Sequence, residues 1–107
     1  MHWDIKPSNI FVTSDNRCKI GDFGVAFKLE DSKNDTLETT EGTYHFMPPE
    51  CWNFENGHQF SGIKCDIWAL GITLFAMTYN SMPFWASNEY ELWTEVLKPL
   101  DFTTDQC

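Results

Sequence analysis

The pattern of apolar and polar positions predicts a largely helical chain that carries one small β-hairpin. Residues 10–12 (Ile-Phe-Val) and 18–20 (Cys-Lys-Ile) are short apolar or alternating runs on either side of the turn formers at 13–17, which predicts a hairpin. Residues 64–78 are apolar nearly all round, which predicts a helix buried on every side. Residues 89–97 place apolar and acidic side chains at helical spacing, which predicts a surface helix ended by the following proline.

Polar segments separate these elements. Residues 21–42 show no apolar periodicity and predict a long loop, and loops of more than ~15 residues in a compact domain are usually functional or disordered. Two successive prolines at 48–49 remove two backbone donors and predict that no regular element continues there. Residues 53–62 form a second polar segment before the long helix.

Length and charge restrict the class of protein. The chain has 107 residues, which corresponds to one domain or part of one. Its formal net charge is −9 and no stretch is rich in Lys or Arg, which argues against nucleic acid or an anionic membrane surface as a direct partner. The acidity serves solubility, or alternatively provides a surface that receives basic substrate segments.

Cysteine usage and apolar runs suggest a cytoplasmic location. Four cysteines lie at spacings that fit neither a zinc site nor a disulfide framework, so we expect free thiols in a reducing compartment. The most apolar run, 67–77, is too short to span a bilayer. No basic segment followed by an apolar run opens the chain, so we expect no signal peptide.

Several short motifs follow one another in a fixed order. A tripeptide alone recurs by chance, but four motifs with the predicted strand, loop and helix correctly placed between them are specific. They are His-x-Asp-x-Lys-Pro-x-Asn at 2–9, Asp-Phe-Gly at 22–24, Gly-Thr at 42–43 ahead of Met-Pro-Pro-Glu at 47–50, and Asp-x-Trp-x-x-Gly at 66–71. Over essentially its whole length, the chain resembles the eukaryotic protein kinases of the Ser/Thr type. Residues 42–50 and 60–71 resemble most the calcium/calmodulin-dependent kinase kinase branch.

The resemblance implies an α+β chain that is part of a bilobal protein kinase fold. Residues 1–107 would be a partial kinase domain, mainly the helical C-terminal lobe, with the small hairpin and a long activation segment. The glycine-rich loop, strand lysine and helix glutamate of the N-terminal lobe are not found, nor are the final helices of the C-terminal lobe. We expect a segment encoded upstream to supply the missing lobe, and we expect the 107-residue chain alone neither to bind ATP tightly nor to phosphorylate protein.

The resemblance also assigns the chemistry, with ATP and Mg²⁺ as cofactors and a protein as substrate. Asp4 would orient the substrate hydroxyl and accept its proton, and Lys6 would stabilise charge on the γ-phosphate. Asn9 and Asp22 carry the oxygen ligands that suit magnesium, and the hairpin between them would bring them together. Taken singly, each of these residues could be an ordinary loop or turn former.

Other residues would shape the site rather than react. His2 and Phe23, with Gly24 beside them, would form part of a stack that links the two lobes. Phe11 would form the floor of the adenine pocket, or would be a plain core residue of its strand. Asp66 would accept backbone amides of the catalytic loop, or would be a first-turn acid favoured by the helix dipole.

The activation segment supplies the remaining candidates. Thr43 would contact the catalytic Asp and Lys, which is a feature of Ser/Thr kinases. Thr39 and Thr40 lie where activating phosphorylation occurs, or are ordinary solvated threonines. Glu50 would close the segment, and its usual arginine partner is absent from the sequence, so burial would leave it unpaired at a cost of several kcal/mol.

Trp3 departs from the family pattern. It takes the place of an arginine that grips the activation-loop phosphate in most members, and indole offers one N–H and no charge. We therefore expect activation not to be switched through this contact. A second function class stays open beside the kinase: a truncated, catalytically inactive binding module that acts through its activation segment and the helix at 89–97.

Overall fold

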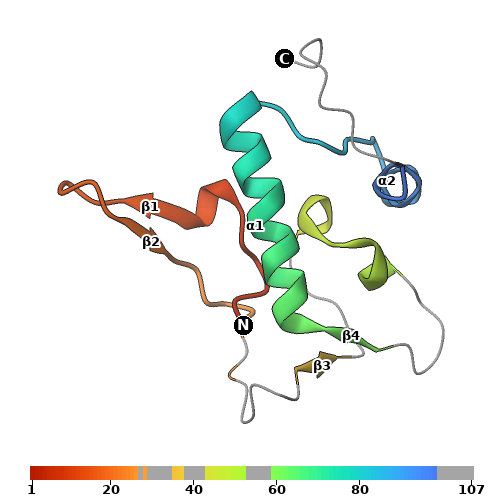
Figure 1. Cartoon of the computed structure of the whole chain (residues 1–107), viewed down its shortest axis with the longest axis horizontal. Helices are drawn as coiled ribbons and strands as arrows, with labels where there is room; N and C mark the ends of the chain where they lie inside the picture. The colour runs from red at the N-terminus through yellow and green to blue at the C-terminus, as the bar shows by residue number, and fades with distance from the viewer. Residues whose placement is uncertain (27, 29–34, 38–42, 53–58, 99–107) are drawn as a thin grey trace.

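A long helix, α1, runs through the centre of the structure, and the other elements are arranged around it (Figure 1). The computed structural model describes residues 1–26, 28, 35–37, 43–52 and 59–98. The elements in chain order are the 3-10 helix η1 (Pro7–Asn9), strands β1 (Ile10–Val12), β2 (Cys18–Ile20) and β3 (Thr36–Leu37), 3-10 helices η2 (Tyr44–Phe46) and η3 (Pro49–Trp52), strand β4 (Phe60–Ser61), and helices α1 (Gly62–Tyr79) and α2 (Glu89–Val96). Two two-stranded antiparallel sheets, β1-β2 and β3-β4, and the helices confirm a mixture of helix with small sheets.

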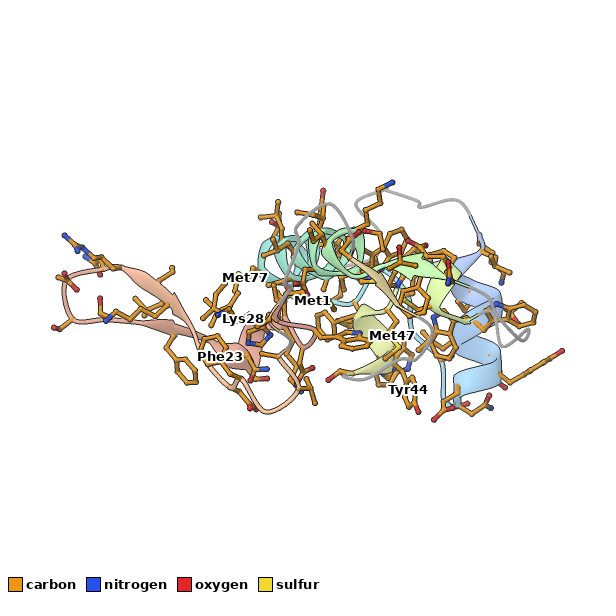
Figure 2. The ribbon with its side chains drawn as sticks, turned by 90° about the horizontal axis from the view of Figure 1, so that it is seen from below. Met1, Phe23, Lys28, Tyr44, Met47 and Met77 are labelled. Carbon is orange, nitrogen blue, oxygen red and sulfur yellow. The ribbon has the colours of Figure 1, made fainter. Side chains whose placement is uncertain are left out.

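The predicted hairpin is confirmed. Strands β1 and β2 pair antiparallel with Ile10 opposite Ile20, and the turn is closed by a Thr13 N–H bond of 2.8 Å to the Arg17 carbonyl. Asn16 supplies the left-handed turn conformation (φ 61°), which Asn tolerates better than most residues. The hairpin projects away from the body that contains α1 and α2 (Figure 2).

Helix α1 begins two residues before its predicted start, because two side chains cap it. The Ser61 hydroxyl accepts from the Lys64 N–H at 3.2 Å, and the Asp35 carboxylate accepts from the Ile63 N–H at 2.9 Å and from the Ser61 hydroxyl. These bonds satisfy helix N–H groups that have no partner inside the helix, and they lower the pKa of Asp35, the Ser61 bond most and the Ile63 bond next.

The prediction that this helix is buried on every side was wrong. Its core-facing side carries buried residues such as Cys65, Ala69 and Ile72. A stripe at alternating spacings of four and three is exposed, from 38% for Ile63 to 67% for Leu74: Ile63, Ile67, Leu70, Leu74 and Met77. An all-round apolar helix needs neighbours on all sides, and none of the described elements covers this stripe.

Two further predictions need correction. The segment 21–42, predicted to be a loop throughout, contains strand β3, which pairs with β4 through Thr36 opposite Ser61. Residues 47–50 do not exclude regular structure, because η3 starts at Pro49; proline is tolerated at the first position of a helix, where its missing N–H has no partner in any case.

The second helix is confirmed as a surface helix. Helix α2 is capped by the Asn88 side chain, which accepts from the Glu91 N–H at 2.9 Å, and it buries Leu92 and Val96 while Tyr90 stays exposed. These buried residues join one core cluster with Met47, Cys51, Trp52, Phe60, Cys65, Ile72 and Phe84. No helix among the described residues is long and apolar enough to cross a membrane.

Candidate functional site

The first residues of the chain are held against the second turn of α1. The two carboxylate oxygens of Asp66 accept the backbone N–H groups of His2 and Trp3, each at 2.8 Å. Trp3 has a left-handed backbone (φ 69°), which costs a non-glycine residue roughly 1–2 kcal/mol. Two hydrogen bonds to a charged acceptor, each worth about 1.5–3 kcal/mol, offset that cost. Trp3 itself is partly buried against the core cluster.

The ring of His2 ties this loop to the end of the hairpin. Its Nδ1 accepts from the Asp4 N–H at 3.1 Å, so its Nε2 carries the proton and donates to the Gly21 carbonyl at 2.7 Å. Phe23 packs on the same ring edge-to-face, with the ring centroids 5.3 Å apart. Gly21 also donates its N–H to the Asn9 carbonyl at 2.8 Å. The residues before and after the hairpin are therefore joined at its base.

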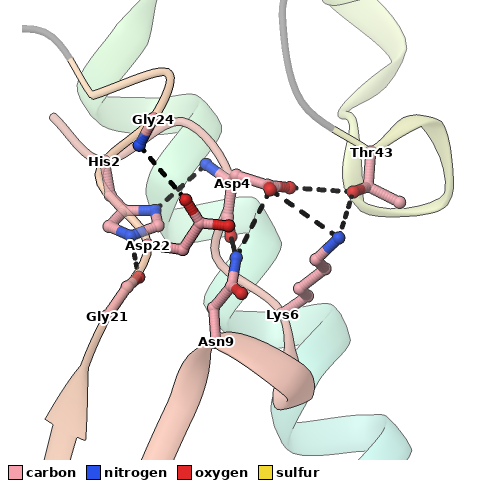
Figure 3. Close-up of polar contacts among 8 residues, drawn as sticks. All are labelled: His2, Asp4, Lys6, Asn9, Gly21, Asp22, Gly24 and Thr43. Atoms are coloured by element: carbon pink, nitrogen blue, oxygen red, sulfur yellow. Dashed lines mark hydrogen bonds and ion pairs between the residues drawn. The ribbon is translucent and has the colours of Figure 1, made fainter.

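Thr43 links the two charged residues of the loop (Figure 3). Its hydroxyl donates to Asp4 Oδ1 at 2.8 Å and accepts from Lys6 Nζ at 2.9 Å. Lys6 Nζ also lies 3.6 Å from Asp4 Oδ2, and the two side chains are only 27% and 15% exposed. One hydroxyl from a residue about 40 positions away thus fixes the mutual position of an acid and an ammonium group.

Asn9 and Asp22 complete the cluster. Buried Asn9 donates through Nδ2 to the Asp4 carbonyl at 2.7 Å and to Asp4 Oδ2 at 3.3 Å, so its amide oxygen takes no part in those bonds. Asp22 is exposed, has a left-handed backbone (φ 56°), and accepts from the Gly24 N–H at 3.2 Å. In Figure 3 the side chains of Asp4, Asn9 and Asp22 converge on one region.

Not every candidate joins this cluster. Phe11 and Phe23 are 54% and 67% exposed, so the interpretation of Phe11 as a plain core residue was wrong. Glu50 is also exposed, and the burial cost expected for it does not arise. Thr39 and Thr40 lie outside the described residues.

The sequence interpretation missed two residues that position the site. Gly21 was treated only as the start of a loop, yet both its backbone polar groups are bonded, and a Cβ there would lie 2.5 Å from the Phe11 ring. Its place directly before the Asp-Phe-Gly motif was the signal in the sequence that could have identified Gly21 as part of the site. Asp35 caps α1, the helix that carries Asp66. Because Asp35 lies in the polar segment 21–42, the sequence pattern did not indicate that contact.

Comparison with known proteins gives a family match. The family described as Protein kinase domain matches residues 1–105. The chain is 41% identical over 108 residues to the serine/threonine-protein kinase stk11 of Xenopus laevis, covering 100% of this chain and 24% of that protein. It is 39% identical over 103 residues to the serine/threonine-protein kinase ssp1 of Schizosaccharomyces pombe, covering 91% and 16%. For the serine/threonine-protein kinase GRIK2 of Arabidopsis thaliana, the identity is 38% over 97 residues, covering 91% and 23%.

The chain spans about a quarter or less of the length of these relatives. The kinase resemblance found in the sequence motifs is confirmed, whereas its placement in the calcium/calmodulin-dependent kinase kinase branch stays a prediction. The chain belongs to the protein kinase family, and its relatives are serine/threonine kinases.

Proposed function

We propose that this chain is the central part of the larger, helical lobe of a serine/threonine protein kinase. Within the complete kinase, it contributes the residues that transfer a phosphoryl group from ATP to a protein hydroxyl. Relatives about four times longer match it over nearly its whole length, so the glycine-rich, nucleotide-covering lobe is assigned to sequence outside these 107 residues. Residues 22–50 are assigned as the activation segment.

We assign Asp4 as the residue that binds the reacting hydroxyl of the substrate. Thr43 occupies one of its carboxylate oxygens and Asn9 the other, but each oxygen has two acceptor sites, so a substrate hydroxyl still has a place to donate. This arrangement orients the hydroxyl and provides an acceptor for its proton. Lys6, fixed by Thr43, places a positive charge beside the acid, where it can neutralise the negative charge that is spread over the oxygens of the transferring phosphoryl group.

The residues present fit magnesium bound together with a nucleotide. Asn9 turns its amide nitrogen to Asp4, which leaves a carbonyl oxygen, and Asp22 adds a carboxylate; both suit a hard cation. Among the described residues no group of three or more His, Cys, Asp or Glu could hold a metal alone. Magnesium typically takes one or two carboxylates plus phosphate oxygens, so ATP would complete the set. Bound Mg²⁺-ATP would supply the phosphoryl group and neutralise its charge.

Two finer assignments go with this function. Phe11, 54% exposed on the hairpin, is assigned to the lower side of the adenine ring, since its ring lies against Gly21 and the rest of it is open to a ligand. A cytoplasmic location is proposed because Cys18, Cys51 and Cys65 are all free thiols, as expected of a protein in a reducing compartment.

The bridge from Thr43 to Asp4 and Lys6 is the observation that carries this proposal, and a chimera tests it. Residues 1–107 replace the matching segment of the Xenopus laevis kinase, which is 41% identical. The chimera is assayed for transfer of labelled phosphate from ATP to a protein substrate, followed by phosphoamino-acid analysis. We expect label on Ser and Thr.

The matched control is the same chimera with Asp4→Asn, which keeps shape and removes the proton acceptor. We expect its kcat to fall by about 10²–10⁴-fold. If the folded chimera shows no transfer, or if Asp4→Asn is as active as its parent, the assignment of these residues to catalysis is wrong. The non-catalytic binding module would then be the better description.

A further inference from the structure

Two cysteines lie in contact beneath the catalytic cluster. Cys51 belongs to η3 and Cys65 to the first turns of α1, and their sulfur atoms are 3.0 Å apart. They are only 3% and 5% exposed, and both are free thiols. A disulfide has its sulfurs ~2.05 Å apart, so the pair needs only a small approach to close.

Both cysteines help to line a small cavity. Its volume is about 20 Å³, and its lining includes Cys51, Cys65, Asp4, Thr43 and Asp66. A cavity needs roughly 10–15 Å³ to hold one water molecule. A reagent not much larger than water, such as hydrogen peroxide, therefore suits this space, whereas glutathione disulfide is far too large.

The two thiols are not equivalent. The hydrogen bond with Cys65 and then burial raise the pKa of Cys51 far above its ordinary value, so Cys51 keeps its proton. Either sulfur can donate the hydrogen bond that joins them. Because the thiolate is the attacking species in thiol oxidation, its raised pKa makes Cys51 a poor nucleophile, and the first step is assigned to Cys65.

We propose that Cys51 and Cys65 form a peroxide-sensitive dithiol that closes reversibly to a disulfide. Cys65 attacks one peroxide oxygen, the O–O bond breaks, and Cys65 becomes a sulfenic acid while water leaves. The Cys51 sulfur then attacks the Cys65 sulfur, the S–O bond breaks, and a second water leaves with the Cys51 proton. Two thiols lose two electrons in total, and one hydroperoxide accepts them.

The cross-link would act directly on the architecture of the site. Cys65 precedes Asp66, which holds the backbone of His2 and Trp3, and Cys51 follows the Met-Pro-Pro-Glu motif. The disulfide would fasten the end of the 22–50 segment to the helix turn that carries the catalytic loop. This chemistry does not depend on the proposed phosphoryl transfer and can be measured without it.

The test uses the chimera that carries residues 1–107, with Cys18→Ser and Cys107→Ser, so that Cys51 and Cys65 are the only cysteines of this segment. The chimera is exposed to hydrogen peroxide, free thiols are alkylated, and peptides are mapped by mass spectrometry. We expect a Cys51–Cys65 cross-link that has lost two hydrogens and that a reducing agent reverses. It should form at least about tenfold faster than in denaturing urea, because the fold holds the sulfurs together. The unfolding temperature of the oxidised protein should be higher than that of the reduced protein by about 5 °C or more.

A second set of variants separates the pair from the other cysteines. In the chimera with Cys65→Ser, Cys51 should stay alkylatable after peroxide treatment, whereas in Cys18→Ser alone the cross-link should form as in the unmodified chimera. Equal rates of cross-linking in native buffer and in urea would overturn the proposal. So would oxidation of Cys51 at an unchanged rate when Cys65 is Ser.

Discussion

Replacing Thr43 by valine removes one hydroxyl from the centre of the candidate site while nearly preserving its volume. In the structure that hydroxyl donates to Asp4 at 2.8 Å and accepts from Lys6 at 2.9 Å. Without it, Lys6 keeps only the longer 3.6 Å approach to the other oxygen of Asp4. The mutual position of acid and ammonium is then no longer fixed.

The expected cost follows from the two bonds. Each joins a hydroxyl to a charged group, a class worth about 1.5–3 kcal/mol. Asp4 and Lys6 are 15% and 27% exposed, so water can replace part of what is lost, and we take the value of one bond rather than two. At about 1.4 kcal/mol per tenfold in rate, Thr43→Val should lower kcat/KM by roughly 10–100-fold.

The assay is phosphoryl transfer by the chimera described above, with Thr43→Ser as the matched control because serine keeps the hydroxyl and loses only a methyl group. We expect the serine variant to stay within about threefold of the parent. Equal damage by serine and valine would show that the methyl group, and hence packing, is what matters. A valine variant as active as the parent would refute the role of the bridge.

Three further changes test other contacts. Asp66→Asn turns an N–H₂ toward one of the two backbone donors of His2 and Trp3, and should lower the free energy of unfolding in urea by about 2–4 kcal/mol; a loss within experimental error would contradict this. Asn80 ends α1 with a left-handed backbone (φ 52°), so Asn80→Gly should leave the unfolding temperature unchanged or higher, whereas Asn80→Val should lower it. The folded-state pKa of Asp35 is lowered, so its carboxylate stabilises the fold above the unfolded pKa of about 4 and loses that contribution as pH falls through the lower folded value. The difference in unfolding temperature between the unmodified chain and Asp35→Asn should therefore shrink below about pH 4, and a difference independent of pH would oppose this.

Local patterns predicted the elements whose start and stop signals lie in the adjacent sequence. The hairpin followed from turn formers between two short apolar runs, and α2 from the helical spacing of its apolar and acidic residues and the proline that follows them. The start of α1 was missed although its N-cap, Ser61, directly precedes the helix, because Ser61 stands at the end of a polar segment and was counted with it. The second capping side chain, Asp35, lies 28 residues before Ile63, whose N–H it binds. Strand β3 was missed because its partner β4 lies on the far side of residues 43–52.

Burial was the property that the sequence predicted least well. An all-round apolar helix indicates that every face is meant to be covered, but it does not indicate by what. In the described residues one face of α1 packs on the core while the stripe from Ile63 to Met77 remains exposed. The order and spacing of the motifs, by contrast, singled out Asp4, Lys6 and Thr43, and their side chains are hydrogen-bonded to one another.

The N-terminal end of α1 holds together segments that are distant in sequence. The N-terminal turns of α1 and the Ser61 cap bind the 2–9 loop through Asp66, the 35–37 segment through Ser61, and η3 through the Cys65 contact with Cys51. Each of these contacts joins residues at least 14 positions apart, so none is visible as a local pattern. A substitution in these turns should therefore disturb the site more than one of similar size near Tyr79, even though neither position touches the reacting groups. The first two turns of α1 therefore set the geometry of the 2–9 loop, through the bonds of Asp66 to His2 and Trp3.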